Sequence, residues 1–344
     1  MPERGLSYRD SGVDIDAATR AMGGIAQMLR STRTADTLSD LGSFGGLYRV
    51  PRGLKSPVLV ASTDGVGTKL KLAFMTGRHD TVGEDLVNHC VNDILVQGAS
   101  PLFFLDYIGL GQLQEGVVEA LVRGIARGCR ANGCALLGGE TAEMPDFYAP
   151  GEYDLAGTIV GIVEEERVLD GSKVRHGDAI IALGSAGLHT NGYSLARRVV
   201  FDHMRLGPDD EFPEEGASVA EVLLRVHRSY LGSVRPLLES GRVHALAHIT
   251  GGGLIDNVPR VLPAGLSARI EQDSWQVPPV FRVLQRAGGI DAREMFRAFN
   301  MGVGMILIAA AENADGLVEQ LRSSGERAWI AGGIISGGRE VVLS

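Results

Sequence analysis

The segment Ser62-Thr63-Asp64-Gly65-Val66-Gly67-Thr68-Lys69 follows an apolar, β-prone run at 58–61 and is the most informative part of the sequence. A strand that ends in a carboxylate and continues into two glycines places an acid and bare backbone N–H groups at one sheet edge. A hydroxyl and an ammonium follow directly. These are the parts of a site for a cation and a phosphate. The spacing matches neither the Walker pattern nor a dinucleotide fingerprint, and alone it is equally compatible with a glycine turn and a solvated lysine.

Length and composition indicate an α/β enzyme of about two domains. The chain has 344 residues, 44% of them hydrophobic, with 47 glycines. Its net charge of −9 argues against nucleic acid as the main partner, because phosphate backbones require basic surfaces. Three cysteines without CxxC spacing favour a reducing compartment. The N-terminus has no apolar signal core and no run is long enough to span a bilayer, so we expect a cytoplasmic protein without membrane partners.

Strand-like and helix-like segments alternate along the chain and predict a two-domain α/β (α+β) design. The charged stretch at 164–173 is the best boundary, which gives domains of 1–168 and 169–344, and residues 1–57 are expected to be partly mobile. Strands are predicted at 58–62, 102–108, 134–137, 154–163, 179–183, 305–311, 328–335 and 340–343, and helices at 84–97, 114–132, 193–201, 219–239, 279–287 and 312–324.

The predicted helix at 84–97 has an unusual polar face. It lacks the long charged side chains of a solvated helix and carries short acids and amides together with a histidine: Asp85, Asn88, His89, Asn92 and Asp93. We favour metal or ligand contact for this face, with Asp93 as a second carboxylate beside Asp64 for Mg²⁺. The alternative is a polar stripe that is buried against another element and satisfied by backbone groups.

A third candidate carboxylate follows an apolar strand in Gly138-Gly139-Glu140, where the glycines let the backbone approach a ligand. Alone, Glu140 would be an exposed residue in a turn. Together with Asp64 and Asp93 it completes a predicted set of three metal ligands.

The loop His189-Thr190-Asn191-Gly192 contains the histidine with the strongest functional prediction. A histidine in a glycine-flanked loop can exchange a proton near neutral pH or donate to an oxyanion. Asn191 could instead only cap the following helix. His244 and His248 are weaker candidates that could share one helical face, and no HExxH pattern surrounds them.

The ordered set of motifs resembles the phosphoribosylformylglycinamidine cyclo-ligases, also called aminoimidazole ribonucleotide synthetases. The set begins with 8–16 (YRDSGVDID) and continues through the motifs already quoted to the last strands, so that it covers essentially the whole chain. The most specific members are Asp93-x4-Gly98-Ala99-x-Pro101 and the GGETAEMP run at 138–145, and the others are DGVGTK at 64–69, HTNG at 189–192 and HITGGG at 248–253.

The resemblance implies an ATP- and Mg²⁺-dependent ring closure of formylglycinamidine ribonucleotide to aminoimidazole ribonucleotide, ADP and phosphate in purine biosynthesis. It implies metal ligation by Asp64, Asp93 and Glu140. It further implies catalytic roles for Asp64 and Lys69, and for His189 at the formyl oxygen. The implied contacts to ATP and its phosphates are Asp64, Gly65, Gly67, Thr68, Lys69, Asp93, Gly138, Gly139, Asn191 and Gly192.

The resemblance also implies a homodimer, in which N-terminal strands of two copies form a shared β-barrel beside the ATP cleft. One departure concerns the nucleotide. Members of this family often carry a lysine in the helix after the GVDID segment, whereas 21–29 contains none here, which leaves Arg30 or Arg33 as substitutes.

Relatives of this architecture carry out other ATP chemistry. Selenophosphate synthetase needs an N-terminal reactive cysteine, the hydrogenase-maturation dehydratase a C-terminal one, and thiamine-monophosphate kinase adjacent aspartates where this chain has Thr63-Asp64. The large amidotransferase of the preceding purine step matches these motifs less well. A nucleotide-binding dimer without catalysis would lack one of the chemical groups, and all of them are present.

Overall fold

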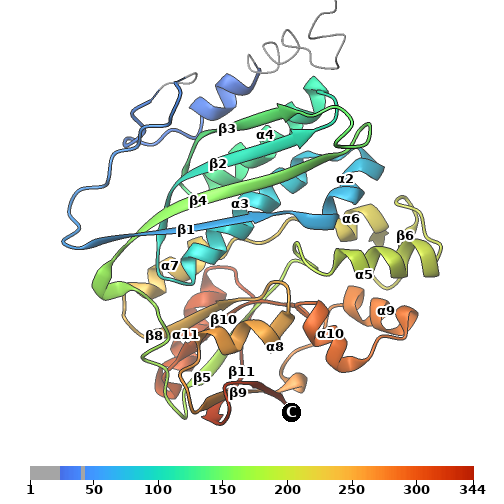
Figure 1. Ribbon diagram of the computed structural model, residues 1–344. Helices are drawn as coiled ribbons and strands as arrows, with labels where there is room; N and C mark the ends of the chain where they lie inside the picture. The colour runs from blue at the N-terminus through green and yellow to red at the C-terminus, as the bar shows by residue number, and fades with distance from the viewer. Residues whose placement is uncertain (1–23, 40–42) are drawn as a thin grey trace, which may run out of the picture.

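A computed structural model describes residues 24–39 and 43–344. Most of its strands belong to two sheets (Figure 1). The first has the order β1-β4-β2-β3 and the second β12-β9-β11-β5-β10-β8, while β6 and β7 pair separately. The motif at 8–16, the start of 21–29, and the parts of the predicted mobile segment 1–57 at 1–23 and 40–42 lie outside the described residues. The strands are β1 (Pro57–Gly65), β2 (Ser100–Leu110), β3 (Ala135–Glu143), β4 (Tyr153–Glu164), β5 (Ala179–Gly184), β6 (Glu211–Phe212), β7 (Ala217–Ser218), β8 (Val243–His248), β9 (Leu266–Ile270), β10 (Val303–Ala309), β11 (Ala328–Ser336) and β12 (Val341–Leu343).

Most helices follow or precede these strands. In the described part of the chain, none is long and apolar enough to cross a membrane. A π-helical segment, Arg198–His203, continues α5. The helices are α2 (Leu70–Thr76), α3 (Asp80–Leu95), α4 (Glu115–Ala131), α5 (Tyr193–Arg197), α6 (Val219–Leu223), α7 (Leu231–Leu238), α8 (Gly253–Asn257), α9 (Pro279–Gly288), α10 (Ala292–Ala298) and α11 (Ala311–Ser323).

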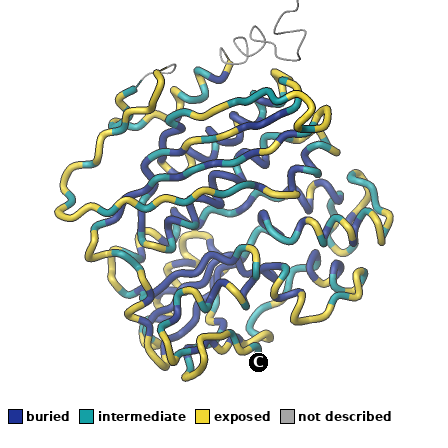
Figure 2. Tube along the Cα trace, viewed as in Figure 1, coloured by how far each residue is buried: buried dark blue, intermediate teal, exposed yellow. Residues whose placement is uncertain are grey.

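Helices α3 and α4 cover one face of the first sheet. The two helices cross at backbone contact, because a Cβ atom at Gly83 or Gly124 would overlap the main chain of the other helix. Alternation along β1 turns Ser62 and Asp64 toward α3 and leaves Leu59 on the uncovered face. Exposed and half-buried positions alternate along this strand in Figure 2. The end of β1 therefore holds Ser62 and Asp64 against α3, while Leu59 is exposed on the other face of the sheet.

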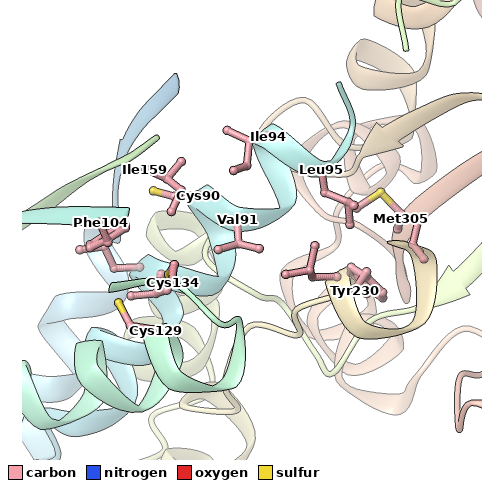
Figure 3. Close-up of a cluster of buried hydrophobic side chains, with 14 of the residues drawn as sticks. Cys90, Val91, Ile94, Leu95, Phe104, Cys129, Cys134, Ile159, Tyr230 and Met305 are labelled. Atoms are coloured by element: carbon pink, nitrogen blue, oxygen red, sulfur yellow. The ribbon is translucent and has the colours of Figure 1, made fainter. Parts of the chain in front are cut away.

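Helix α3 is packed between the two halves of the chain. Figure 3 shows Cys90, Val91, Ile94 and Leu95 of α3 with Phe104 and Ile159 of the first sheet on one side and Tyr230 and Met305 on the other. These side chains belong to one continuous hydrophobic core that includes both sheets. One consequence is that residues on α3 can meet residues from the C-terminal half at a shared site.

The inner strands β5 and β10 of the second sheet are buried on both faces. Along β5, Ile181 and Leu183 join the core shared with α3, whereas Ile180 and Ala182 pack with the C-terminal helices. The predicted boundary at 168 lies in the connection between the last strand of the first sheet, which ends at Glu164, and β5.

Most predicted strands are confirmed with small shifts at their ends, but two predictions were wrong. The predicted helix at 219–239 is two helices, α6 and α7, joined by an irregular segment at 224–230. Its backbone hydrogen-bonds to the polar face of α3, which competes with helix formation. His244 and His248 lie on strand β8 and share no helical face.

Candidate active site

A cavity of about 310 Å³ lies where the end of β1 and the last turns of α3 meet β8 and the loop that follows it. It is lined by groups from both halves of the chain, and the two predicted carboxylates Asp64 and Asp93 are among them. The polar side chains that line it include Asp64, His89, Asp93, His248, Thr250 and Arg260.

Asp64 ends β1 at the mouth of this cavity, and its side chain is 44% exposed. The backbone N–H of Gly65 donates to one carboxylate oxygen at 2.7 Å, and His89 Nε2 lies 2.7 Å from the other. Burial raises the pKa of Asp64, but the hydrogen bond and the charge of His89 outweigh it, so the net pKa is lowered. Asp64 is therefore ionised and still faces open space.

Asp93 is the second carboxylate and is held from two sides. Ser62 Oγ donates to one oxygen at 3.1 Å, and His248 Nδ1 lies 2.8 Å from the other. Burial raises the pKa of Asp93, but the hydrogen bond and charge of His248 and the charge of His89 together lower it by more. The net pKa therefore lies below its usual range. The structure thus brings Asp64 and Asp93 together as two ionised oxygen donors.

His89 lies between the two carboxylates, with Nε2 2.7 Å from Asp64 and 3.7 Å from Asp93. Burial lowers the pKa of His89, but these neighbouring acids outweigh burial and the net pKa is raised. The sequence placed His89 on the polar face of α3 without assigning it a role. Its position on that face, four residues before Asp93, was the available indication.

Two buried histidines lie behind the cavity. His189 and His227 stack with ring centroids 4.0 Å apart and planes 20° apart. Burial and the positive charges nearby hold the pKa of each well below its usual range, so both are neutral. Sequence analysis missed His227, because no motif marks it and it belongs to the segment predicted as helix.

The loop at 189–192 is structurally constrained. His189 has a left-handed backbone with φ 62°, accepts a hydrogen bond from the Ala186 N–H at 3.2 Å, and is 1% exposed. Gly192 begins α5 with φ 78°, and a Cβ there would overlap Phe299. His189 is not among the residues that line the cavity, so it does not lie at a position from which it can donate directly to a substrate oxygen there.

Lys69 also departs from its predicted role. Its ammonium has no exposed surface, lies 2.7 Å from the Asp85 carboxylate, and donates to the carbonyls of His189 and Arg225 at 3.1 and 2.8 Å. An ammonium with these partners has no donor left for a phosphate. The correction has a physical cause, because the turn at Gly67–Lys69 directs the side chain inward, under the 224–230 segment.

The remaining residues of this turn keep an accessible position. Gly67 has φ 62°, a backbone conformation that favours glycine. A Cβ atom at Gly65 would lie 3.3 Å from the Leu155 carbonyl oxygen. Thr68 is exposed, with its hydroxyl 2.9 Å from Ser194 Oγ. These groups can present backbone N–H donors and one hydroxyl beside Asp64.

The predicted trio of carboxylates does not form within one chain. Glu140 lies on β3, and the strand order puts two strands between β3 and β1. Three strand spacings of roughly 4.8 Å separate Asp64 from that strand by about 14 Å, too far for one ion to contact both. Gly138, Gly139 and Glu140 instead border a second cavity of about 240 Å³ that also contains Asp106.

The donors at the first cavity fit Mg²⁺. Mg²⁺ prefers oxygen ligands and keeps several waters, so one or two carboxylates are sufficient. Asp64 and Asp93 offer such oxygens at the edge of an open space, and their lowered pKa keeps them ionised. Asn191 lies close to the loop that follows β8, because a Cβ atom on Gly251 would be 3.3 Å from the side-chain oxygen of Asn191.

We expect acid to destabilise this protein through its neutral histidines. His189 and His227 stay unprotonated when folded but protonate below pH ~6.5 when unfolded, so stability is present above that pH and is lost as pH falls. Each contributes about 1.4 kcal/mol per pH unit at most, and His89, with a raised pKa, opposes the loss. Between pH 7.5 and 5.5 we expect a net loss of about 1–3 kcal/mol in urea unfolding. His227→Phe should reduce that pH dependence, and a stability that rises on acidification would contradict the prediction.

Comparisons with known proteins agree with this architecture. Family models for the AIR synthase related protein match residues 46–163 with the N-terminal domain and residues 175–343 with the C-terminal domain. Among solved structures, a thiamine-monophosphate kinase from Stenotrophomonas maltophilia has a TM-score of 0.70 at 22% identity and covers 93% of this chain and 96% of that one. The hydrogenase maturation protein HypE in complex with ATP has a TM-score of 0.67 at 21% identity over 97% and 93%. At these identities the likeness concerns the fold alone.

Sequence relatives are much more similar. The phosphoribosylformylglycinamidine cyclo-ligase of Citrifermentans bemidjiense is 51% identical over 96% of both chains. That of Sorangium cellulosum is 52% identical over 97% of this chain and 96% of its own. With about half of its residues identical along nearly its whole length, and with both domain models matched, this chain belongs to the phosphoribosylformylglycinamidine cyclo-ligase family.

Proposed function

We propose that this chain uses ATP to close the imidazole ring of formylglycinamidine ribonucleotide, giving 5-aminoimidazole ribonucleotide, ADP and phosphate in purine biosynthesis. Membership of the family makes the chain a cyclo-ligase. One observation carries the assignment of the site, namely the pair of ionised carboxylates, Asp64 and Asp93, on either side of His89 in a cavity between the two halves.

The chemistry divides into activation and ring closure. Phosphorylation turns the formyl oxygen into a good leaving group, after which the amidine nitrogen forms the C–N bond and phosphate departs with the C–O electron pair. Asp64 and Asp93 would hold Mg²⁺, which supplies positive charge beside the triphosphate. The N–H group of Gly67, the Thr68 hydroxyl and the guanidinium of Arg260, which lines the cavity, would orient and neutralise the phosphates.

Lys69 and His189 contribute from behind the cavity in this proposal. Lys69 neutralises Asp85 and holds the His189 carbonyl, so it fixes the 189–192 loop. His189 stacks on His227 and does not contact the formyl oxygen. Asn191 and Gly192 shape the approach to the cavity. This arrangement replaces the direct roles that the sequence predicted for Lys69 and His189.

We propose the second cavity for the base of ATP. Its walls are mostly apolar, Gly138 and Gly139 leave room beside the edge strand, and Asp106 is its acidic member. Burial raises the pKa of Asp106 to about 7, and a hydrogen bond from an exocyclic amino group would favour its ionised form. Glu140 remains a proposed nucleotide contact in this cavity.

The uncovered face of the first sheet supports a homodimer. Leu59 is 62% exposed, Tyr107 38% and Leu105 36%, and β1 is an edge strand. An apolar sheet face with a free edge favours association with another sheet, and a second copy offers the same surface. We expect Leu59→Asp to raise the dimer dissociation constant at least tenfold, since burial of a leucine contributes about 1.5–3 kcal/mol.

Light scattering during gel filtration measures this prediction against the 36.5 kDa chain. Val342→Asp is the matched control, because Val342 is a 40% exposed apolar residue on β12 of the other sheet. A wild-type monomer, or a control that dissociates as readily as Leu59→Asp, would contradict the proposed interface.

The cytoplasm remains the proposed compartment. Cys90, Cys129 and Cys134 are buried free thiols. Such thiols are compatible with a reducing environment.

The test of the reaction mixes the purified chain with Mg·ATP and formylglycinamidine ribonucleotide. Diazo coupling detects the aromatic amine of the product, and ADP is counted in parallel. We expect one amine for each ADP. ADP without amine would mean that the chain activates another acceptor, and neither product from a folded, ATP-binding chain would leave only a binding role.

A further inference from the structure

A groove of about 540 Å³ lies between the two halves of the chain and shares no lining residue with either cavity described above. Its walls come from the start of β2, the connection between β4 and β5, the end of α7 and the start of β8. Its volume lies within the range of small-molecule sites, which occur preferentially between domains. The charged side chains that line it are Glu166, Arg167, Lys173, Arg235 and Glu239.

The three cations of this groove, Arg167, Lys173 and Arg235, have donors available to a ligand. All three are exposed, and none forms an ion pair or a side-chain hydrogen bond with another described residue. Arg286, by contrast, is also exposed but lies 2.6 Å from the Glu214 carboxylate. On a chain with a net charge of −9, three unpaired cations around one hollow form a local positive site that attracts an anion.

The other members of the groove indicate what the anion carries. Glu166 and Glu239 are exposed carboxylates that likewise have no hydrogen-bond or ion-pair partner in the part of the chain that the structure describes. They would repel a bare inorganic anion, but they can accept hydrogen bonds from the hydroxyl groups of an organic one. Leu169 and Leu238 are half-buried against the hydrophobic core and offer an apolar surface to a carbon skeleton.

We propose that this groove binds a sugar phosphate. Its phosphate is held by Arg167, Lys173 and Arg235, and its hydroxyl groups donate to Glu166 and Glu239. A guanidinium can donate two parallel hydrogen bonds to phosphate oxygens, and an ammonium adds a compact positive charge. The site is distinct from the candidate active site, and the proposal does not depend on the reaction proposed there.

The groove and the candidate active site nevertheless share structural elements. The Leu169 N–H, from the wall of the groove, donates at 3.1 Å to the carbonyl of Gln97, which lines the active-site cavity. Strand β8 contributes Val243 to the groove and His248 to the cavity. A ligand in the groove would therefore contact the same elements as a substrate in the cavity, without contacting the reacting groups.

Ribose 5-phosphate is the probe for the first test, and isothermal titration of the whole chain measures its binding. We expect Arg235→Gln to raise the Kd at least about tenfold, because a hydrogen bond to a charged group contributes this much or more. Arg293→Gln is the matched control. It removes an exposed arginine of α10, outside the groove, with the same change in net charge, and should leave the Kd within about twofold. A wild-type chain that does not bind the probe, or two variants with equal effects, would overturn the proposal.

Two further arms establish where the probe binds and which of its groups are recognised. Arg260→Gln changes the active-site cavity and should leave the Kd unaltered. If Arg260→Gln weakens binding and Arg235→Gln does not, the probe occupies the active site and the groove proposal fails. Inorganic phosphate lacks the hydroxyl donors and should bind at least about tenfold more weakly than ribose 5-phosphate. Equal binding of the two would overturn the assignment of a sugar phosphate.

A second measurement needs no variant, because the chain has only four lysines. Lys69 is buried and Lys71 is paired with Glu152, whereas Lys55 and Lys173 are exposed. Acetylation with a succinimidyl ester, followed by mass spectrometry, measures the reactivity of each lysine. At about ten times its Kd, ribose 5-phosphate should slow the acetylation of Lys173 about tenfold and leave Lys55 unchanged. Unchanged acetylation of Lys173, or equal protection of both lysines, would overturn the proposal.

Discussion

Asp64→Asn is expected to lower Mg·ATP-dependent turnover by at least a hundredfold while leaving the fold intact. The amide oxygen can still accept from the Gly65 N–H, whereas the amide nitrogen replaces the oxygen that faces His89, so one of the two local hydrogen bonds persists. What is lost is one anionic ligand for Mg²⁺ at the mouth of the cavity, and removal of one group that stabilises the charge of the transition state typically costs about 10²–10³ in kcat. Steady-state assays over a range of Mg²⁺ concentrations measure the loss.

Asp154→Asn provides a matched control for this substitution. Asp154 likewise accepts from the backbone N–H of the next residue, at 2.9 Å, but it lies at the start of β4 and is exposed. We expect the control to keep wild-type kcat. If Asp64→Asn were equally active, Asp64 could not be a ligand of the metal.

Lys69→Met is expected to destabilise the folded chain by about 3–5 kcal/mol, because it leaves the buried Asp85 carboxylate without its counter-charge. The carbonyls of His189 and Arg225 would lose a charged donor as well. Urea unfolding followed by circular dichroism measures the change. The double variant Lys69→Met/Asp85→Leu removes both charges and should recover most of the lost stability.

This experiment also separates the two roles considered for Lys69. A lysine that contacts the γ-phosphate would leave stability unchanged when replaced by methionine and would raise KM for ATP. Replacement of a lysine that neutralises a buried acid would instead lower the free energy of unfolding. A stable Lys69→Met protein with weak ATP binding would restore the role predicted from sequence.

The sequence predicted those parts of the site that depend on local pattern. An acid at the end of an apolar strand and another on a helix were sufficient to name Asp64 and Asp93, and the structure places both at one cavity. The sequence could not show that the rest of the polar face of α3 serves packing. Asp85, Asn88 and Asn92 are satisfied by Lys69 and by the backbone at 227–230, which is more than 130 residues away for the two amides.

The errors share this cause. The spacing of apolar residues at 219–239 fits a helix, and only the polar groups of α3 explain why the chain is irregular at 224–230. His227 was invisible for the same reason, since its role depends on partners from three distant segments. Glu140 lies on β3, which two strands separate from β1, so its predicted place beside Asp64 and Asp93 is not reproduced within one chain; strand order cannot be read from a strand-end motif.

The placement of α3 between the two sheets has a consequence for how this protein can be divided. Its apolar face is buried partly by the second half, and its polar face is satisfied by the 224–230 segment. A fragment ending near residue 168 would expose the polar face of α3 and part of its apolar face to water, and would leave the Lys69–Asp85 pair without its carbonyl partners. The two halves match separate domain models, yet α3 joins them, so we expect a chain cut in the connection between β4 and β5 to give two pieces that are less soluble than the whole protein.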